Sequence, residues 1–204
     1  EQTGAMLRLQ DQDQLWVGRI RSALRDGRLR LVQQPIASLV GDDAGMVDTV
    51  VRLLDEDGHE VLPSEFMPAA ERNDLMRGID RWVIDAVLTL AAGQESGALF
   101  VRLSRDSLAD ATLPAWIGER LQAVKVEPRR LVFQIREEAV GQQLRETVAL
   151  QDALHSLGCR LALEGFGLGH DSDQLLRHLS PDFVKINGAL LQGLAICGRC
   201  GRRM

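Results

Sequence analysis

The chain has 204 residues, which is enough to bury a full core, and a single domain is the expected organisation. Hydrophobic residues make up 45% and charged residues 26%, the composition of an ordinary globular protein. The net charge of -5 argues against a nucleic acid polymer as partner, because polyanion-binding surfaces carry a basic excess, but it allows a small anionic ligand.

Residues 1–12 are polar and show no period, so we interpret them as a linker or the end of a preceding domain, followed by a folded domain over 13–194. Residues 1–4 lack the basic-then-apolar pattern of a signal peptide. A helical period begins at Asp13, and Gly27 stands where a helix would end. The apolar residues on its shared face are Leu15, Trp16, Ile20 and Leu24.

Six apolar segments read as strands, and most are separated by segments of helical period. The predicted strands cover 29–32, 47–54, 98–103, 131–135, 160–163 and 183–186. Helices are predicted around 79–90, over 113–124 and 143–157, and, as a short element, between the last two strands. A turn is expected at 55–58, and the stretch containing Pro63 and Pro68 is predicted to be a loop.

Alternating strands and helices at this spacing predict an α/β fold with mainly parallel strands. Such a fold is either a barrel or an open doubly wound sheet. No GxGxxG or GxxxxGK[ST] follows the first strand, so the common nucleotide-binding open sheets lack support. Periodicity alone leaves barrel and open sheet as alternatives.

Eight short pieces of sequence stand in one order over about residues 15–193. In that order the chain resembles the EAL family of cyclic di-GMP phosphodiesterases, whose motifs are QPI, EALLR with a DxxG turn, PxEFIPxAE, IDxWV, VNLS, LEITE, FGTG...LxxL and LKID. The matching segments here are 34–36, 48–52 with 55–58, 63–71, 79–83, 101–104, 133–137, 166–169 with 175–177, and 184–187.

The resemblance implies a modified (β/α)8 TIM-type barrel with its site at the carboxyl ends of the strands. It also implies that the barrel is incomplete after the sixth strand, because two further βα units would follow residue 194. Residues 195–204 read as an irregular basic tail, in which Cys197 and Cys200 are weak support for half a zinc site. A truncated chain, a partner covering the gap and an incomplete sequence all explain this ending.

Hydrolysis of a phosphodiester usually requires hard divalent ions held by carboxylates. The resemblance places the family's metal ligands at six positions of this chain, all of them altered. One carboxylate is shortened and another lengthened, an arginine replaces an asparagine, and three acidic positions have lost their charge. The residues are Asp48, Arg102, Gln134, Glu164, Gly165 and Asn187.

The loss of three negative charges and the gain of one positive charge weaken divalent-ion binding. We therefore expect no metal centre, no cofactor and no phosphodiesterase activity. The alternative interpretation of Asp48 and Glu164 is that they are simply polar residues at strand ends, without a role in metal binding.

A cyclic di-GMP pocket needs a cation for phosphate, polar groups for guanine edges and apolar walls. Arg52 is the main phosphate candidate, with a surface ion pair as its alternative, and Asp80 is a ligand residue or a helix cap. Arg102 contacts phosphate or pairs with Asp48, and Lys185 holds phosphate or pairs with Glu164. The implied ligand positions are Gln34, Pro35, Asp48, Val50, Arg52, Pro68, Glu71, Asp80, Arg102 and Lys185.

The leading hypothesis is an inactive, receptor-type EAL module of bacterial signal transduction. It binds cyclic di-GMP and relays that binding through a protein partner or a homodimer. The alternatives are a scaffold that binds no nucleotide and, less favoured, residual metal-dependent hydrolysis. No apolar run reaches the roughly 18–20 residues of a membrane span. Three cysteines are an odd number and do not suggest a set of paired disulfides. A cytoplasmic location is therefore expected.

Overall fold

The computed structural model of the protein describes residues 2–38, 45–94, 96–169 and 172–191. Its centre is one mixed sheet in the order β1-β2-β4-β5-β6-β7, with β3 beside β2. β1 and β3 run antiparallel to β2, and the remaining neighbours are parallel. The strands are β1 Leu29–Pro35, β2 Met46–Leu54, β3 Glu60–Val61, β4 Ala98–Arg102, β5 Leu131–Arg136, β6 Arg160–Phe166 and β7 Phe183–Ile186.

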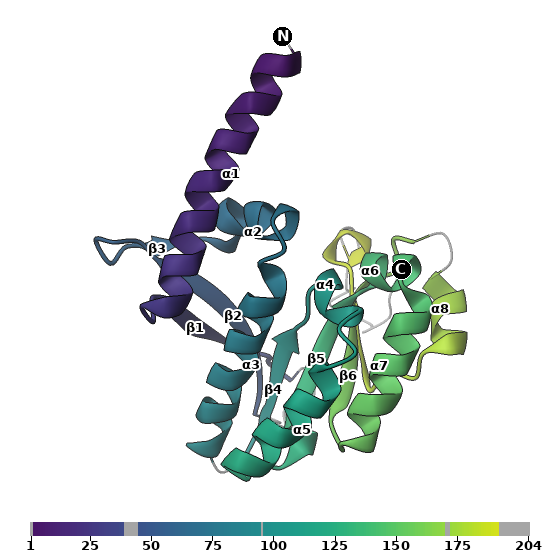
Figure 1. The fold of residues 1–204 in the computed structure, drawn as a ribbon. Helices are drawn as coiled ribbons and strands as arrows, with labels where there is room; N and C mark the ends of the chain where they lie inside the picture. Colours follow the sequence, from purple (N-terminus) through teal and green to yellow (C-terminus); the bar gives the residue numbers. More distant parts are fainter. Residues whose placement is uncertain (1, 39–44, 95, 170–171, 192–204) are drawn as a thin grey trace, which may run out of the picture.

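Helices follow most strands and cover the outer face of the sheet, with α3, α5 and α7 side by side in Figure 1. They are α1 Gln2–Arg25, α2 Pro63–Arg72, α3 Met76–Ala92, α4 Arg105–Leu108, α5 Leu113–Val124, α6 Glu137–Gln142, α7 Leu144–Ser156 and α8 Ser172–His178, with 3-10 turns η1 Pro128–Arg130 and η2 Gly188–Leu191. In the described ranges no helix is long and apolar enough to cross a bilayer.

The alternation predicted from the sequence is confirmed, and α5 and β7 have the predicted bounds. The first helix differs: α1 begins at Gln2 and not at Asp13. Its first turns contain no proline and several good helix formers, so propensity alone supports a helix without an apolar stripe. Figure 1 shows the N-terminal part of α1 projecting beyond the other elements. The domain boundary placed between residues 12 and 13 stays a prediction.

The predicted loop around Pro63 and Pro68 is wrong, because these residues lie in helix α2. Pro63 is at the first helical position, where the missing N–H has no intrahelical role. The Leu62 amide donates to Glu65 Oε1 at 3.2 Å, which satisfies a donor at the helix start. Pro68 removes one hydrogen bond inside the helix, and the buried face of Phe66, Ala69 and Ala70 compensates through packing.

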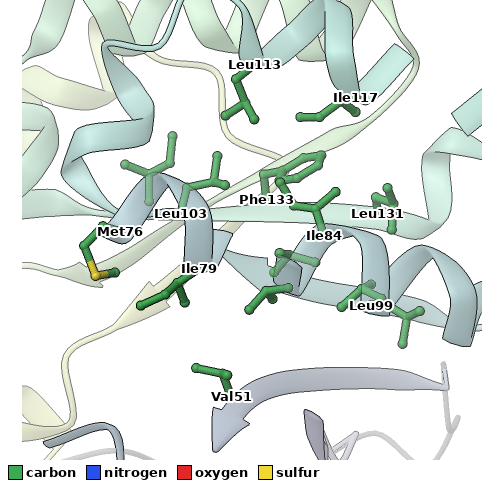
Figure 2. Packing of buried hydrophobic residues seen from close by; sticks show 14 of the residues in the cluster. Val51, Met76, Ile79, Ile84, Leu99, Leu103, Leu113, Ile117, Leu131 and Phe133 are labelled. Atoms are coloured by element: carbon green, nitrogen blue, oxygen red, sulfur yellow. The ribbon is translucent and has the colours of Figure 1, made fainter. Parts of the chain in front are cut away.

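The sheet has a different core on each face. Between sheet and helices lies the larger cluster, in which Ile84 of α3 and Ile117 of α5 lie to either side of Phe133 on β5 (Figure 2). On the inner face a smaller cluster of Ala98, Phe100, Val132 and Ala162 closes the base of the barrel. Because side chains alternate along a strand, β5 is buried on both faces and reads as a continuous apolar run.

Candidate functional site

Five polar side chains meet on the inner face of the sheet, four toward the carboxyl ends of β4, β5, β6 and β7 and one near the start of β2. Arg102, Gln134, Glu164 and Lys185 each follow an apolar inner-face residue of their own strand by two positions, whereas Asp48 is directly opposite Phe100. Arg102 is opposite Gln134, and Glu164 is opposite Lys185. Barrel enzymes place their catalytic groups at this end. The five residues are Asp48, Arg102, Gln134, Glu164 and Lys185, all at positions predicted from the sequence.

Both carboxylate oxygens of Asp48 accept hydrogen bonds from inside the chain. Oδ1 accepts from Gln134 Nε2 at 2.7 Å, and Oδ2 accepts from Lys185 Nζ at 2.8 Å. The ammonium group also lies 4.9 Å from the centre of the Phe100 ring. Since β4, β5 and β6 separate Asp48 from Lys185 in the sheet, this ion pair requires a strongly curved sheet.

Glu164 is engaged in the same way by Arg102. The guanidinium Nε donates to Oε2 at 2.7 Å, and Nη2 donates to Oε1. This two-pronged geometry matches the fork of an arginine to a carboxylate. The pairings considered from the sequence, Arg102 with Asp48 and Lys185 with Glu164, are therefore wrong. Arg102 reaches Glu164 across β5 alone, while Gln134 occupies one oxygen of Asp48.

Gly165 and Asn187 offer no inward ligand either. Gly165 has a φ of +76° and lies in a bulge, where the β6–β7 ladder skips from Glu164 to Phe166. An aspartate at this position would be strained. The Asn187 side-chain oxygen accepts a hydrogen bond from the Ala189 amide at 3.0 Å and so helps to form the η2 turn.

The residues present do not fit a two-metal centre. All four oxygens of the surviving carboxylates, Asp48 and Glu164, accept hydrogen bonds from cationic or amide groups of the chain. Two of those donors, Arg102 and Lys185, carry positive charge in direct contact with these oxygens. A hard cation would have to displace these bonds and tolerate the charges, which Coulomb repulsion opposes.

A cavity of about 580 Å³ opens beside this polar group, between the middle of β2, the end of β4 and the helices α2, α3, α4 and α6. Half of the predicted ligand residues line it, namely Val50, Pro68, Glu71, Asp80 and Arg102. The other half lines neither this cavity nor the second one described below: Gln34, Pro35, Asp48, Arg52 and Lys185.

Asp80 lies inside α3 and is almost fully buried, so it does not cap its own helix as considered from the sequence. Its Oδ2 accepts hydrogen bonds from the Ser104 amide at 2.8 Å and from the Ser104 and Ser107 hydroxyls at 2.6 Å each. These serines begin α4, so Asp80 stabilises the start of a neighbouring helix. Burial raises the pKa of the Asp80 carboxyl above its ordinary value, although the three hydrogen bonds oppose this shift.

The β1–β2 pair carries the remaining predicted ligand residues. Gln34 is opposite Asp48 in the ladder, and both Gln34 and Pro35 are exposed. Arg52 is half-buried, and its Nη1 donates to the Val51 carbonyl at 3.1 Å. The surface ion pair considered for Arg52 is not found in the described parts of the chain.

A second cavity of about 640 Å³ lies at the ends of β5 and β6. Three of the implied metal positions, Glu164, Gly165 and Asn187, line it, whereas sequence reasoning did not identify its other residues as a site. Glu137 on its wall is almost buried, and its Oε2 accepts a hydrogen bond from the Gly167 amide at 3.0 Å. Arg136 lines both cavities. The available signal was the motif segment 133–137, which places Arg136 directly after an apolar strand.

Comparison with known protein families matches residues 17–199 of the chain to the EAL domain. Curated relatives include the cyclic di-GMP phosphodiesterases PdeF of Escherichia coli strain K12, 26% identical over 87% of this chain, and PdeB of Shewanella oneidensis, 30% identical over 89%. The matched regions are 24% and 22% of those proteins, so the chain spans about a quarter of their length.

Solved structures with the same fold include EAL domains of FimX. The FimX EAL domain of Pseudomonas aeruginosa bound to c-di-GMP has a TM-score of 0.84 and 37% identity, over 88% of this chain and 74% of that one. The FimX EAL domain of Xanthomonas citri in complex with c-diGMP has a TM-score of 0.83 and 29% identity, over 92% and 74%. The EAL-type TIM-barrel fold predicted from the sequence is thereby confirmed. In the described residues its sheet stays open between β1 and β7.

Proposed function

Because the chain belongs to the EAL domain family, we propose that it is a catalytically inactive member that binds cyclic di-GMP. In this proposal a protein partner, or a second copy of the chain, reads the bound state. The observation that carries the proposal is the pair of internal ion pairs, Arg102 with Glu164 and Lys185 with Asp48, at the strand ends.

The ion pairs argue against hydrolysis. Metal-assisted attack on a phosphodiester needs ions that activate water and neutralise charge on the phosphate. In this chain the two carboxylates that would hold such ions already have cationic partners. Arg102 and Lys185 supply fixed positive charge at the same strand ends, and such charge can attract a phosphate without activating water.

The first cavity supports nucleotide binding. Its volume of about 580 Å³ falls within the roughly 300–1,000 Å³ of small-molecule sites. Val50 and Pro68 supply apolar wall, and the Glu71 carboxylate can accept from a guanine N–H edge. Arg52 has a guanidinium without an ion pair in the described ranges, on the strand that also forms the cavity wall. The similarity to FimX EAL domains bound to c-di-GMP supports the same ligand.

Calorimetry with cyclic di-GMP, with and without EDTA, tests the binding half of the proposal. We expect the same affinity under both conditions and a loss of at least about tenfold for Arg52→Ala, as for a charge-assisted phosphate contact. Arg129→Ala is the matched control, because Arg129 is exposed at the opposite end of the barrel and loses the same charge. Binding that disappears on chelation would contradict a metal-independent site.

A hydrolysis assay tests the other half. The purified chain is incubated with cyclic di-GMP and Mg²⁺ or Mn²⁺, and linear pGpG is quantified against a protein-free blank. We expect no product above the blank. Product formation that depends on the metal would overturn the assignment of an inactive site.

A scaffold that binds no nucleotide is the second candidate, favoured by one observation. Arg102 and Lys185 are already neutralised by Glu164 and Asp48, so two of the predicted phosphate contacts are engaged before any ligand arrives. Absence of binding heat with cyclic di-GMP under both conditions would select the scaffold over the receptor.

A further inference from the structure

The positive charges at the strand ends divide into paired and unpaired ones. Arg102 and Lys185 are each within an ion pair. Arg136, the last residue of β5, has neither an ion pair nor a side-chain hydrogen bond to any residue in the described part of the chain, and it is exposed. Exposed arginines are common on protein surfaces, so only the location of Arg136 can indicate a role in ligand binding.

Arg136 is on the wall of both cavities. It follows Gln134 by two residues on β5, so its side chain leaves the strand on the same inner face, one step farther toward the open end. Its ladder partner is Glu164, whose carboxylate already binds Arg102. Arg136 thus stands beside Glu164 of the Arg102–Glu164 ion pair, on the wall that the two cavities share.

Among the described residues, none of the neighbouring charged side chains forms an ion pair that would neutralise Arg136. Glu138 also lines both cavities but forms no ion pair with Arg136. Glu137 uses Oε2 to accept from the Gly167 amide. Arg105 lines only the first cavity, where its Nη1 donates to Gln142 Oε1 at 3.2 Å. Of the arginines on these walls, Arg136 is the one that faces both cavities.

Cyclic di-GMP carries two phosphates, and one cation site accounts for only one of them. We propose that Arg136 binds the second phosphate, with the ligand lying across both cavities and the first phosphate on the side of β2, the strand that lines the first cavity and carries Arg52 beyond that lining. This inference rests on the proposed function. A guanidinium offers two parallel N–H donors to a phosphate, and an exposed arginine loses little solvation on meeting an exposed anion.

The affinity of three matched variants tests the assignment. Arg136→Gln should weaken cyclic di-GMP binding by about 10- to 100-fold, the range of a charge-assisted contact. Arg136→Lys should lose less, because charge remains while the fork is lost. Arg129→Gln, which removes the same charge at the far end of β5, should change affinity by less than about threefold, the size of screened surface electrostatics.

Phosphorus NMR of the bound ligand supplies a readout that a general electrostatic effect would not move. Wild-type complex should show two phosphate resonances, and Arg136→Gln should shift one and leave the other in place. Equal shifts of both, or an affinity for Arg136→Gln within twofold of wild type, would overturn the assignment while leaving the proposed function intact. If wild-type protein does not bind cyclic di-GMP, the proposed function fails first. A thermal melt of Arg136→Gln checks folding, which we expect to be unchanged for an exposed side chain.

Discussion

Asp80 illustrates how a single motif residue can serve the scaffold of a site. It lies on the wall of the first cavity, yet its buried Oδ2 accepts three hydrogen bonds from Ser104 and Ser107. These bonds hold the start of α4 against α3 next to the end of β4. Its contribution to ligand binding is therefore expected to be indirect, through the position of the cavity wall.

Replacing Asp80 by alanine should lower the free energy of unfolding by roughly 1–3 kcal/mol, the penalty for leaving buried donors unsatisfied. Urea denaturation measures this change. Asp173→Ala on the exposed face of α8 is the control, and we expect it to change stability by less than about 0.5 kcal/mol, as for surface substitutions. An equal loss in both variants would contradict the structural role of Asp80.

Asp80 also predicts a pH dependence of known sign. Burial raises its pKa above the ordinary 3.8, so the folded state binds the proton more tightly than the unfolded state. The stabilisation from this protonation is complete below pH 3.8 and is lost as the pH rises through the folded pKa. Relative to Asp80→Asn, which cannot titrate, wild type should lose stability as the pH rises over that window. Denaturation curves at a series of pH values test this, and a constant difference would refute it.

At the scale of elements, α1 and α2 are joined by one ion pair with good geometry. Arg72 Nε donates to Asp13 Oδ2 at 2.8 Å and Nη2 donates to Oδ1 at 2.7 Å, while Asn73 donates to the same carboxylate at 3.3 Å. The residue next to Arg72 is Glu71, on the cavity wall. The orientation of α1 is thus connected to the helix that borders the proposed binding site.

Asp13→Asn should loosen this connection. The hydrogen bonds from Arg72 hold the pKa of Asp13 below its ordinary 3.8, so the stabilisation is present above that pH and is lost as the pH falls through the folded pKa. Hydrogen exchange measured by mass spectrometry at neutral pH should show faster exchange in α1 for Asp13→Asn. Asp11→Asn, exposed two residues earlier in α1, is the matched control. Equal exchange in the two variants would show that other contacts hold α1.

The whole molecule depends on a sheet that is buried on both faces at its centre. The outer cluster packs helices against β5 around Phe133, and the inner cluster supports the polar strand ends from below. The Lys185 ammonium group lies over the Phe100 ring of that inner cluster and forms an ion pair with Asp48. The proposed site therefore requires a folded sheet, since its ion pairs join strands that are distant in sequence.

Truncation of Phe133 to alanine should destabilise the protein by about 3–5 kcal/mol, because the fully buried ring leaves a cavity between β5 and the helices. Phe183→Ala on the edge strand β7, where the ring is only partly buried, should have a smaller effect. Chemical denaturation of the two variants gives the comparison. A larger loss for Phe183→Ala would contradict the placement of the main core on the outer face.

The thiol of Cys159 reports on the same global fold. It is buried after α7, and burial raises its pKa to about 12. Since the thiolate is the reactive form, native protein should leave Cys159 unlabelled by iodoacetamide at pH 8, whereas unfolded protein should react rapidly. Peptide mapping separates this residue from the other two cysteines. Rapid labelling of Cys159 in native protein would indicate local opening around α7.

Periodicity and local chemistry determined much of this protein from its sequence. Apolar stripes and strand-like runs predicted α5 and β7 with the observed bounds, because such patterns arise from one-sided or two-sided burial. The ordered motifs led to the EAL-type barrel and to the substituted metal positions. Helix α2 was missed because Pro63 and Pro68 suggested a loop, although a proline at the first helical position is favourable.

Only the tertiary structure decided how the charges at the strand ends are paired. The sequence supplied Asp48, Arg102, Glu164 and Lys185, but the ion pairs join β4 to β6 and β2 to β7, and these distances depend on sheet curvature. Likewise, the three hydrogen bonds to Asp80, and the absence of an ion pair for Arg136 among the described residues, follow from packing between elements distant in sequence. Local pattern determines which side chains are available, and long-range geometry determines which of them meet.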